Sequence, residues 1–405
     1  MKAGARSRRL CLVVHAYYEE DARVRRQAET LLAHGWEVDV YGLRRPGDPR
    51  LSEIEGVRLH RLDVRRHQGA GVGVYLVEYL DFFVRALVAT VRDHRRRPFT
   101  IGQAASLPDF LVFALLPLKL AGTPLVLDLH EAMPEFFRSR FPAAAGRLPL
   151  AALRLQERLS IRVADAVMTV NVALGDRLAG LGVPAARLLV LHNSPDPRRF
   201  DPAPYAHRPF MADGTLRLVY AGALTPTYEL ETVVDAVGVL RERRPAMPVA
   251  LELYGRGDSE GPLRRRIAAL NLAERVALRG RIPLEDVPGA IAAADLGLAP
   301  TRRDPFTDLS LSATLFEYAA MGKPVVASAL PTVARYFPPG SVATYTPGDP
   351  ADLAAVVLRL VDQPAEREAR VGATAALAAD LGWDRQASRY LALLERLVAP
   401  GSEAG

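Results

Sequence analysis

Short apolar runs alternate with amphipathic stretches along nearly the whole chain. In the first half the apolar runs are rich in leucine and β-branched residues, which is typical of buried parallel strands. The strands predicted there are Arg9–Val14, Glu37–Tyr41, Val57–Arg61, Pro124–Asp128, Ala166–Val170 and Leu188–Leu191. Between the first two, Val24, Ala28 and Leu31 recur on one face of a predicted helix over Asp21–Ala33. This β–α–β order predicts a parallel sheet covered by helices.

A second series of the same kind follows in the other half. Its predicted strands are Leu216–Tyr220, Val249–Leu253, Val276–Leu278, Leu296–Ala299 and Val325–Ala327. Between the two series, the prolines of residues 194–204 exclude a helix and resist strand pairing. We therefore predict a Rossmann-like domain over 1–195, a linker over 196–214, a second Rossmann-like domain over 215–380, and a C-terminal helix, Trp383–Val398, within a tail over 381–405.

This organisation predicts where a ligand would bind. Open parallel sheets bind ligands beyond the carboxyl ends of their strands, so we expect two α/β domains facing a cleft.

Composition narrows the class further. Of 405 residues, 49% are apolar and 24% charged, which are ordinary globular values. The single cysteine, Cys11, excludes an internal disulfide. The apolar run Leu10–Val14 is too short for the core of a signal peptide, and no run of apolar residues is long enough to span a bilayer. We expect a cytoplasmic protein.

Charge is distributed unevenly. Residues 1–200 carry 30 Lys and Arg against 21 Asp and Glu, whereas the remaining residues carry 22 against 25. A basic half could contact nucleic acid, anionic lipid or an acidic substrate. Nucleic acid is disfavoured, because the chain shows neither an aromatic platform nor a known nucleic-acid-binding motif.

The segment 310–328 is the strongest candidate for chemistry. We expect Ser310 or Ser312 to cap a helix that ends at Gly322, whose free N–H groups would suit a phosphate. Glu317, about one and a half turns into this helix, could accept hydrogen bonds from sugar hydroxyls. From spacing alone, an ordinary solvent-exposed glutamate is the simpler interpretation.

Polar residues in the first half form a second candidate site. His130 and Glu131 follow the strand Pro124–Asp128, where side chains would point into the predicted cleft. Arg23, at a helix start, could hold an acidic ligand, or simply belong to a solvated basic face. The chain contains no Asp-x-Asp, the usual means of holding a metal against a diphosphate, so we expect no metal and no cofactor.

Several segments together resemble glycosyltransferase family 4, retaining enzymes of the GT-B fold. The run Leu315 to Ala327, with Phe-Glu-Tyr at its centre, resembles the family's donor-site helix. Asp21 to Arg26 resembles its first loop and helix, His192 to Asp196 its interdomain segment, Val219 to Leu224 the opening of its second domain, and Leu253 to Gly257 its glycine turn. The order of these segments is the order in the family, which makes the resemblance specific.

The resemblance implies a hexosyltransferase that moves a sugar from a nucleotide-diphosphate-sugar donor to a saccharide or lipid-linked acceptor in cell-envelope polysaccharide synthesis. His130 and Glu317 would then be catalytic, and Arg23, Glu131 and Asn193 would line the acceptor side or the cleft. The donor would be held by Gly222, Gly255, Arg256, Arg302, Arg303, Ser310, Leu311, Ser312 and Glu317.

The chain departs from the family at three positions. Leu309 stands where most members have an acidic residue, and Ala223 and Tyr228 stand where members commonly have an arginine and a lysine that bind the pyrophosphate. A subset of the family also lacks the acidic residue, so activity is not excluded. Arg302, Arg303 and Arg256 are the candidates to meet the phosphate charge instead. A nucleotide-sugar epimerase of the same fold and a degenerate, non-catalytic binding subunit remain as alternatives.

The first half also suggests a membrane contact. An apolar helix predicted over Val74–Val91 is followed by Arg95, Arg96 and Arg97, a combination that suits anionic lipid. We therefore expect reversible attachment to the inner face of a membrane, although a packed core helix with a solvated end fits the same pattern.

Overall fold

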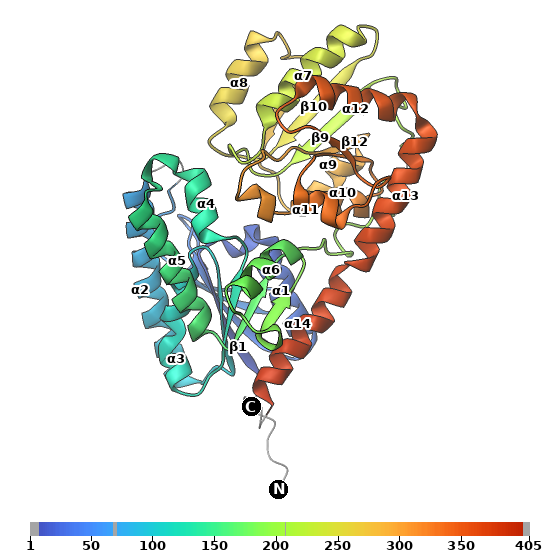
Figure 1. The fold of residues 1–405 in the computed structure, drawn as a ribbon. Helices are drawn as coiled ribbons and strands as arrows, with labels where there is room; N and C mark the ends of the chain where they lie inside the picture. The colour runs from blue at the N-terminus through green and yellow to red at the C-terminus, as the bar shows by residue number, and fades with distance from the viewer. Residues whose placement is uncertain (1–7, 68–70, 207, 400–405) are drawn as a thin grey trace. The chain divides into compact units, whose positions relative to one another are not determined.

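The computed structural model describes residues 8–67, 71–206 and 208–399. The chain divides into two compact units (Figure 1). Unit 1 comprises residues 1–193 and 384–405, and unit 2 comprises residues 194–383. The C-terminal helix therefore returns to the N-terminal unit, which the sequence pattern did not indicate.

Unit 1 is built on an eight-stranded sheet in the order β3-β4-β2-β1-β5-β6-β7-β8. The strands are β1 (Arg9–Val14), β2 (Glu37–Leu43), β3 (Leu51–Ile54), β4 (Val57–Leu62), β5 (Ile101–Ala105), β6 (Leu125–Leu129), β7 (Ala166–Thr169) and β8 (Leu188–Val190). All neighbouring strands are parallel except β3 and β4. The chain enters at β1 and builds outward on both sides, so the strand order reverses between β1 and β5.

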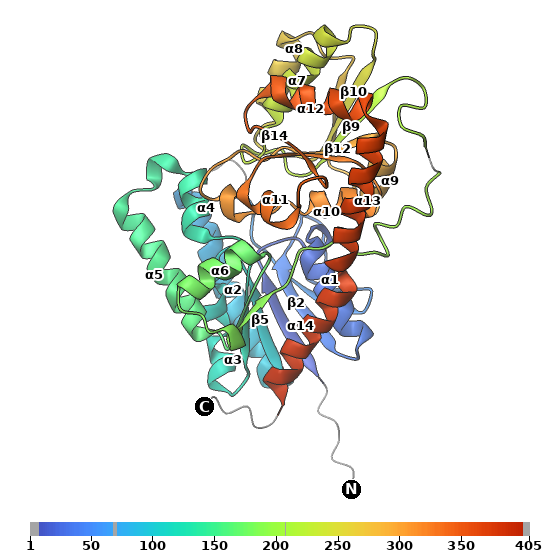
Figure 2. The same cartoon turned by 45° about the vertical axis from the view of Figure 1, so that its right-hand side comes forward.

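Helices cover both faces of this sheet. They are α1 (Ala22–Ala33), α2 (Val72–Arg96), α3 (Leu116–Leu120), α4 (Met133–Arg140), α5 (Arg147–Val163), α6 (Val172–Gly180) and α14 (Trp383–Val398). Ala104 of β5 packs in one core with Phe82 of α2 and Ile161 of α5. The preceding residue, Gln103, faces the other side, where it contacts Gln27 of α1 and Tyr390 of α14. Figure 2 shows α14 in front of this sheet.

Unit 2 contains a six-stranded, fully parallel sheet in the order β11-β10-β9-β12-β13-β14. The strands are β9 (Leu216–Ala221), β10 (Val249–Tyr254), β11 (Val276–Gly280), β12 (Leu296–Ala299), β13 (Val325–Ser328) and β14 (Ala343–Tyr345). The helices are α7 (Leu230–Arg243), α8 (Glu260–Ala269), α9 (Val287–Ala292), α10 (Thr314–Ala320), α11 (Pro331–Tyr336), α12 (Pro350–Asp362) and α13 (Pro364–Asp380).

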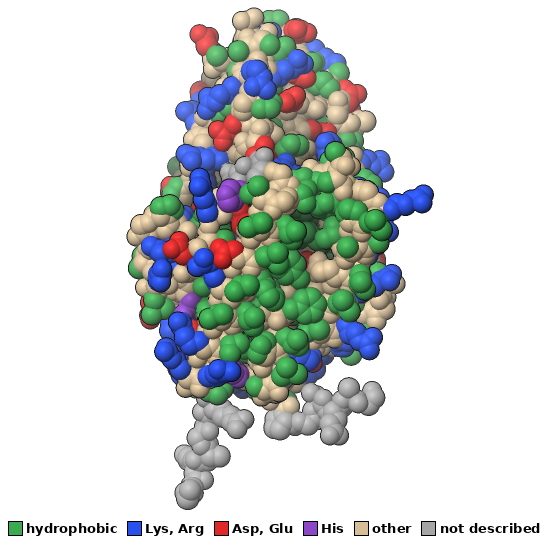
Figure 3. Space-filling view, turned by 90° about the vertical axis from the view of Figure 1, so that its left-hand side faces the viewer, with side chains coloured by type: hydrophobic (Ala, Val, Ile, Leu, Met, Phe, Trp, Pro, Cys, Tyr) green, Lys and Arg blue, Asp and Glu red, His purple; other side chains and the backbone are tan. Residues whose placement is uncertain are grey.

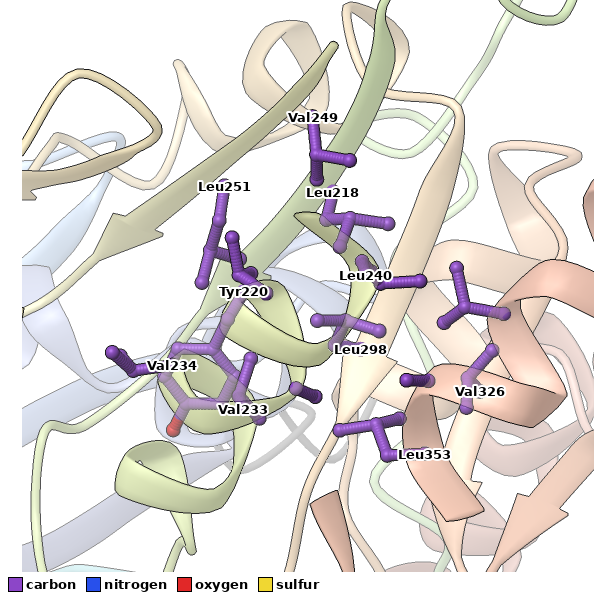
Figure 4. Packing of buried hydrophobic residues seen from close by; sticks show 14 of the residues in the cluster. Leu218, Tyr220, Val233, Val234, Leu240, Val249, Leu251, Leu298, Val326 and Leu353 are labelled. Carbon is purple, nitrogen blue, oxygen red and sulfur yellow. The ribbon is translucent and has the colours of Figure 1, made fainter. Parts of the chain in front are cut away.

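Two apolar cores hold the layers of unit 2 together. On one face, side chains of α7 and α12 pack on β9, β10, β12 and β13 (Figure 4). On the other face, α9, α10 and α11 pack on the same sheet. The strand order reverses between β9 and β12, and such a reversal is where open α/β sheets bind ligands.

The residues predicted as a linker, 196–214, belong to unit 2. Phe200 and Tyr205 pack against its second core, and the guanidinium of Arg208 donates a hydrogen bond of 2.8 Å to Asp295. Asp295 also accepts from the backbone of Met211 and Arg217. The described residues of the segment, 196–206 and 208–214, have no regular secondary structure, as the prolines predict, but they are fastened to the body of the unit.

Candidate functional site

Close backbone contact between two loops shapes the carboxyl edge of the unit 2 sheet. The loop after β9 contains Gly222, and the loop after β10 contains Gly255 and Gly257, with φ of 144° and 157°. A Cβ atom on Gly255 would lie 1.8 Å from the carbonyl oxygen of Gly222, and one on Gly257 would lie 2.3 Å from that of Leu224. Only glycine permits this approach. The structure thus brings together Gly222 and Gly255, which the sequence had predicted as site residues.

The loop after β12 joins this edge from the other side of β9. Tyr228 and Thr301 form an antiparallel β-bridge, and the backbone N–H of Arg302 donates to the carbonyl of Thr227 at 2.9 Å. Arg302 therefore lies beside Tyr228, the position at which family members commonly carry lysine. Its guanidinium is 3.3 Å from Asp304 and about half exposed.

The other two candidate arginines also have exposed side chains. Arg303 lies 3.4 Å from Asp308, in the same loop. Arg256 occupies the glycine turn after β10, and its backbone carbonyl accepts a hydrogen bond of 3.0 Å from Leu224. All three arginines are thus on loops at the carboxyl edge: Arg302 and Arg303 follow β12, and Arg256 follows β10.

The start of α10 differs from the expectation. Neither Ser310 nor Ser312 caps the helix with its side chain: the N-cap is Ala313, and the N–H groups of Leu315 and Phe316 donate to backbone carbonyls instead. The Ser310 hydroxyl donates instead to Phe306 O, and the Ser312 hydroxyl is 2.7 Å from that of Thr314. The prediction failed because both hydroxyls have nearer partners in the irregular segment that precedes the helix.

Glu317 is the fourth residue of α10 and belongs to its first turn, earlier than predicted. The neighbouring Tyr318 holds the helix on the sheet. Its hydroxyl accepts from Ala221 N at 3.2 Å, and its ring lies against Gly297 of β12, where a Cβ atom would come within 2.4 Å. Burial raises the pKa of Tyr318 well above its usual value. Because Tyr318 points into the core, the partly exposed Glu317 points away from it. Leu311, which precedes the helix, packs against the same core.

A buried cluster below this edge was missed by sequence reasoning. Glu229 accepts hydrogen bonds from Tyr345 at 2.6 Å and from Ser328 at 3.2 Å. Ser328 also accepts from Thr301 N at 2.8 Å. Burial raises the pKa of Glu229, against the effect of these hydrogen bonds. The cluster fixes the loop that carries Arg302, and no spacing in the sequence connects its members.

In unit 1 the central feature is a buried ion pair. Arg23, only 3% exposed, donates to both carboxylate oxygens of Asp128, at 3.0 and 2.7 Å, and to Leu191 O. Gln27 donates a further hydrogen bond of 2.8 Å to the same carboxylate. Burial alone would raise the pKa of Asp128, but Arg23 and His130 outweigh it and hold the pKa well below its usual range. Arg23 is therefore engaged with its own unit and positions the end of β6.

His130 and Glu131 follow β6 directly, as predicted. His130 Nε2 lies 3.3 Å from Asp128, and its backbone N–H donates to the Ser106 hydroxyl at 2.9 Å. Burial raises the pKa of Glu131 to about 7, with His130 opposing the shift. Glu131 thus titrates near neutral pH. Asn193 accepts a hydrogen bond from Arg26, a second buried arginine of α1.

His15, at the end of β1, is another polar group that sequence reasoning missed. Its Nε2 is 3.1 Å from Glu78 of α2, which also lies 2.8 Å from His67. The ring of His15 packs edge-on against Tyr79 at 4.9 Å. The signal was available, since His15 follows a predicted strand just as His130 does.

Each unit gathers polar side chains at the carboxyl edge of its own sheet. Unit 2 presents arginines, one carboxylate and a backbone bared by glycines at a strand-order reversal, which suits a phosphorylated ligand. Unit 1 presents His130 and Glu131 at the equivalent edge of its own sheet, where Asp128 and Ser106 hold His130.

Comparison with known proteins agrees with this organisation. Residues 21–194 match the family described as glycosyl transferase 4-like domain, and residues 215–363 match glycosyl transferases group 1. Among curated proteins, the MMP alpha-(1->4)-mannosyltransferase of Mycolicibacterium hassiacum is 27% identical over 300 residues, which cover 70% of this chain and 68% of that protein.

Solved structures show the same fold. Sucrose-phosphate synthase from Thermosynechococcus elongatus aligns with a TM-score of 0.78 at 18% identity, over 97% of this chain and 100% of that one. Anabaena HepE in complex with UDP and glucose aligns with a TM-score of 0.71 at 16% identity, over 95% and 99%. The two family matches, in this order on two parallel-sheet units, establish that the chain is a glycosyltransferase of family 4 with the GT-B fold.

Proposed function

We propose that this glycosyltransferase moves a hexosyl group from a nucleotide-diphosphate sugar to a saccharide or lipid-linked acceptor, with retention of configuration and without a metal. The observation that carries the proposal is the glycine-lined meeting of the β9 and β10 loops beside the Arg302 loop. Because these glycines carry no side chains, a diphosphate can approach the backbone and the neighbouring Arg302 closely. The HepE complex, a structural neighbour that holds UDP and glucose, supports a nucleotide donor.

The unusual Ala223 and Tyr228 are compatible with this function. The Tyr228–Thr301 bridge brings the backbone of Arg302 beside Tyr228, so its guanidinium is our candidate to replace the family's lysine. Arginine recognises phosphate oxygens with two parallel hydrogen bonds, which lysine does not. We therefore assign the phosphate-binding charge to the arginines of the β12 loop.

The chemical requirement is to stabilise a leaving diphosphate. Negative charge develops on that group as the bond to the sugar breaks, and preorganised N–H groups and guanidinium groups lower the barrier. Glu317 would hold sugar hydroxyls from the first turn of α10. Because the sequence contains no Asp-x-Asp, we assign the charge stabilisation to arginines and backbone amides.

Nucleotide release from a panel of nucleotide-diphosphate sugars tests the function. We first expect one donor to raise the melting temperature, since a ligand at 100 times its dissociation constant adds about 2.7 kcal/mol of apparent stability. That donor should then release nucleoside diphosphate only when an acceptor is present, at the same rate with and without EDTA.

Each other outcome of this assay contradicts a part of the proposal. Turnover of the donor to an altered free sugar without acceptor would identify an epimerase. Donor binding without turnover with any saccharide or lipid-linked acceptor would identify a binding subunit. Loss of transfer in EDTA, restored by magnesium or manganese, would contradict metal independence.

We expect the double variant Arg302→Ala, Arg303→Ala to raise the KM for the donor roughly tenfold, because it removes charge-assisted hydrogen bonds to the diphosphate. The matched control is Arg243→Ala, Arg244→Ala, an exposed arginine pair at the end of α7. Helices of this fold run antiparallel to the strands, so that pair lies at the opposite edge of the sheet. Equal donor KM values for the two double variants would refute the role of the β12 loop.

A further inference from the structure

One surface of unit 1 is unusually apolar. Of the eleven large hydrophobic side chains exposed in the described part of the chain, ten lie on α2, α3 and α5. They are Val74, Leu76, Val77, Leu80, Val84, Val88, Leu120, Leu148, Leu155 and Leu159. Figure 3 shows hydrophobic side chains covering this side of the unit, with Lys and Arg around the edges. We call these ten side chains the α2–α5 surface. Exposed apolar patches of this kind usually mark an interaction site.

The apolar side chains on the outer side of α2 are not exposed because the helix is rotated away from the core. Its inner side already carries Phe82 and Ala86 in the core. The inner side also carries buried Glu78, held by His15 and His67, and Asp93, which accepts a hydrogen bond of 2.9 Å from Tyr41. These partners fix the rotation of the helix. The valines and leucines on its outer side are therefore presented to the surroundings by the fold itself.

Helix α5 exposes both apolar and cationic side chains, the two kinds that bind an anionic lipid surface. Leu148, Leu155 and Leu159 recur at helical spacing along its exposed side, and an arginine precedes each of them in the sequence. The arginines form a second stripe next to the leucine stripe. These exposed arginines are Arg147, Arg154 and Arg158, followed by Arg162 one turn later. Leucines beside a row of cations are typical of helices that lie in a membrane interface.

The acidic side chains of the same two helices are buried or paired with arginine. On α2 and α5, Glu78, Asp93 and Glu157 are buried, and Asp81 is 2.7 Å from Arg85. The charge at the basic end of α2 is smaller than the sequence suggested, because the exposed Arg97 pairs with Glu37, whereas Arg95 and Arg96 are exposed beside it. The resulting surface is apolar with a cationic border. If a second copy of the chain covered this surface, a symmetric interface would bring the arginines of the two copies together. This repulsion disfavours a dimer through the surface.

We propose that the α2–α5 surface docks the protein on an anionic phospholipid bilayer, with its valines and leucines inserted between the lipids and its arginines at the headgroups. No helix in the described residues is long and apolar enough to cross a membrane, so the contact is peripheral. This inference is independent of the proposed sugar transfer, because docking requires neither donor nor acceptor.

Sedimentation of the full chain with vesicles tests the proposal. We expect binding to phosphatidylglycerol vesicles, weaker binding at high salt, and little binding to phosphatidylcholine vesicles. Leu155→Ser, Leu159→Ser should weaken binding about tenfold or more. Leu51→Ser should leave binding unchanged, since Leu51 is the exposed hydrophobic residue outside the α2–α5 surface.

A second pair of variants tests how much the arginines contribute to vesicle binding. Arg154→Gln, Arg158→Gln should weaken binding to anionic vesicles roughly 25-fold, at about fivefold per arginine near the surface. Arg243→Gln, Arg244→Gln changes the net charge equally in unit 2 and should bind as the wild type does. Unaltered melting temperatures show that every variant is folded.

Three results would overturn the proposal. They are absence of binding at low salt, equal binding to neutral and anionic vesicles, and equal weakening by the two arginine pairs. A concentration-dependent dimer that Leu155→Ser, Leu159→Ser abolishes, without vesicle binding, would show instead that a second copy covers the surface.

Discussion

Replacing Asp128 by asparagine is expected to lower the free energy of unfolding of unit 1 by about 3–5 kcal/mol, since it leaves a buried arginine without its counter-charge. Arg23 donates to both oxygens of Asp128, and Gln27 donates to the same group. An asparagine would present an N–H₂ group to one of these donors and remove the negative charge. The free energy can be measured by urea unfolding.

The two tryptophans allow each unit to be followed separately. Trp36 lies in unit 1 and Trp383 in unit 2, so a Trp383→Phe background leaves Trp36 as the fluorescent reporter of unit 1. Asp81→Asn is the matched control in the same unit. It breaks the half-exposed pair with Arg85 and should cost only about 0.3–0.5 kcal/mol. Similar losses for Asp81→Asn and Asp128→Asn would contradict the structural role of the buried pair.

The effect of Asp128→Asn should depend on pH in a defined direction. The folded-state pKa of Asp128 lies well below its usual range, whereas in the unfolded chain it is about 3.9. The ionised carboxylate therefore stabilises unit 1 fully above about pH 4, and this stabilisation is lost as the pH falls further. Wild type and variant should accordingly approach each other in stability below about pH 4. A constant difference from pH 6 to pH 3 would assign the effect to packing rather than to charge.

Most strands could be predicted because their apolar runs are strong. The predicted strands Arg9–Val14 and Leu296–Ala299 have the observed bounds, and the others differ by a few residues. The central strand β5 was missed because its sequence, Ile-Gly-Gln-Ala-Ala, has little β propensity. It pairs between β1 and β6, where Gly102 leaves room for Leu125. The small residue at position 102 is required by the packing of Leu125, which is distant in sequence.

In the candidate site, too, features set by local sequence could be predicted and contacts between distant residues could not. Glycines and strand-end residues such as Gly255 and His130 could be located, because the rule for parallel sheets depends only on the order of elements. The pairing of Arg23 with Asp128 and the Glu229–Tyr345 contact join residues about a hundred positions apart. No local pattern reports such partners, so the sequence offered a ligand or a solvated basic face for Arg23, and the structure pairs it with Asp128 instead.

Glu317→Gln is expected to lower kcat/KM for donor-dependent transfer by about 10- to 150-fold. This range corresponds to the roughly 1.5–3 kcal/mol that a hydrogen bond to a charged group contributes. Glu317 extends from the first turn of a helix that Tyr318 fastens to β9 and β12. The amide keeps the size of the side chain, and Tyr318 is untouched, so the melting temperature of unit 2 should not change.

The way in which kcat and KM divide this loss indicates what Glu317 does. A higher KM at constant kcat would mean that it binds ground state and transition state equally, whereas a fall in kcat at constant KM would mean that its hydrogen bonds strengthen as the glycosidic bond breaks. We expect the second pattern, because positive charge develops on the sugar ring in an oxocarbenium-like transition state and a carboxylate interacts with it more strongly than an amide. Glu366→Gln is the matched control, since Glu366 is the first-turn glutamate of α13 and is paired with Arg370 at 2.6 Å. Equal kinetics for the two variants would remove Glu317 from the donor site and leave α10 a purely structural helix.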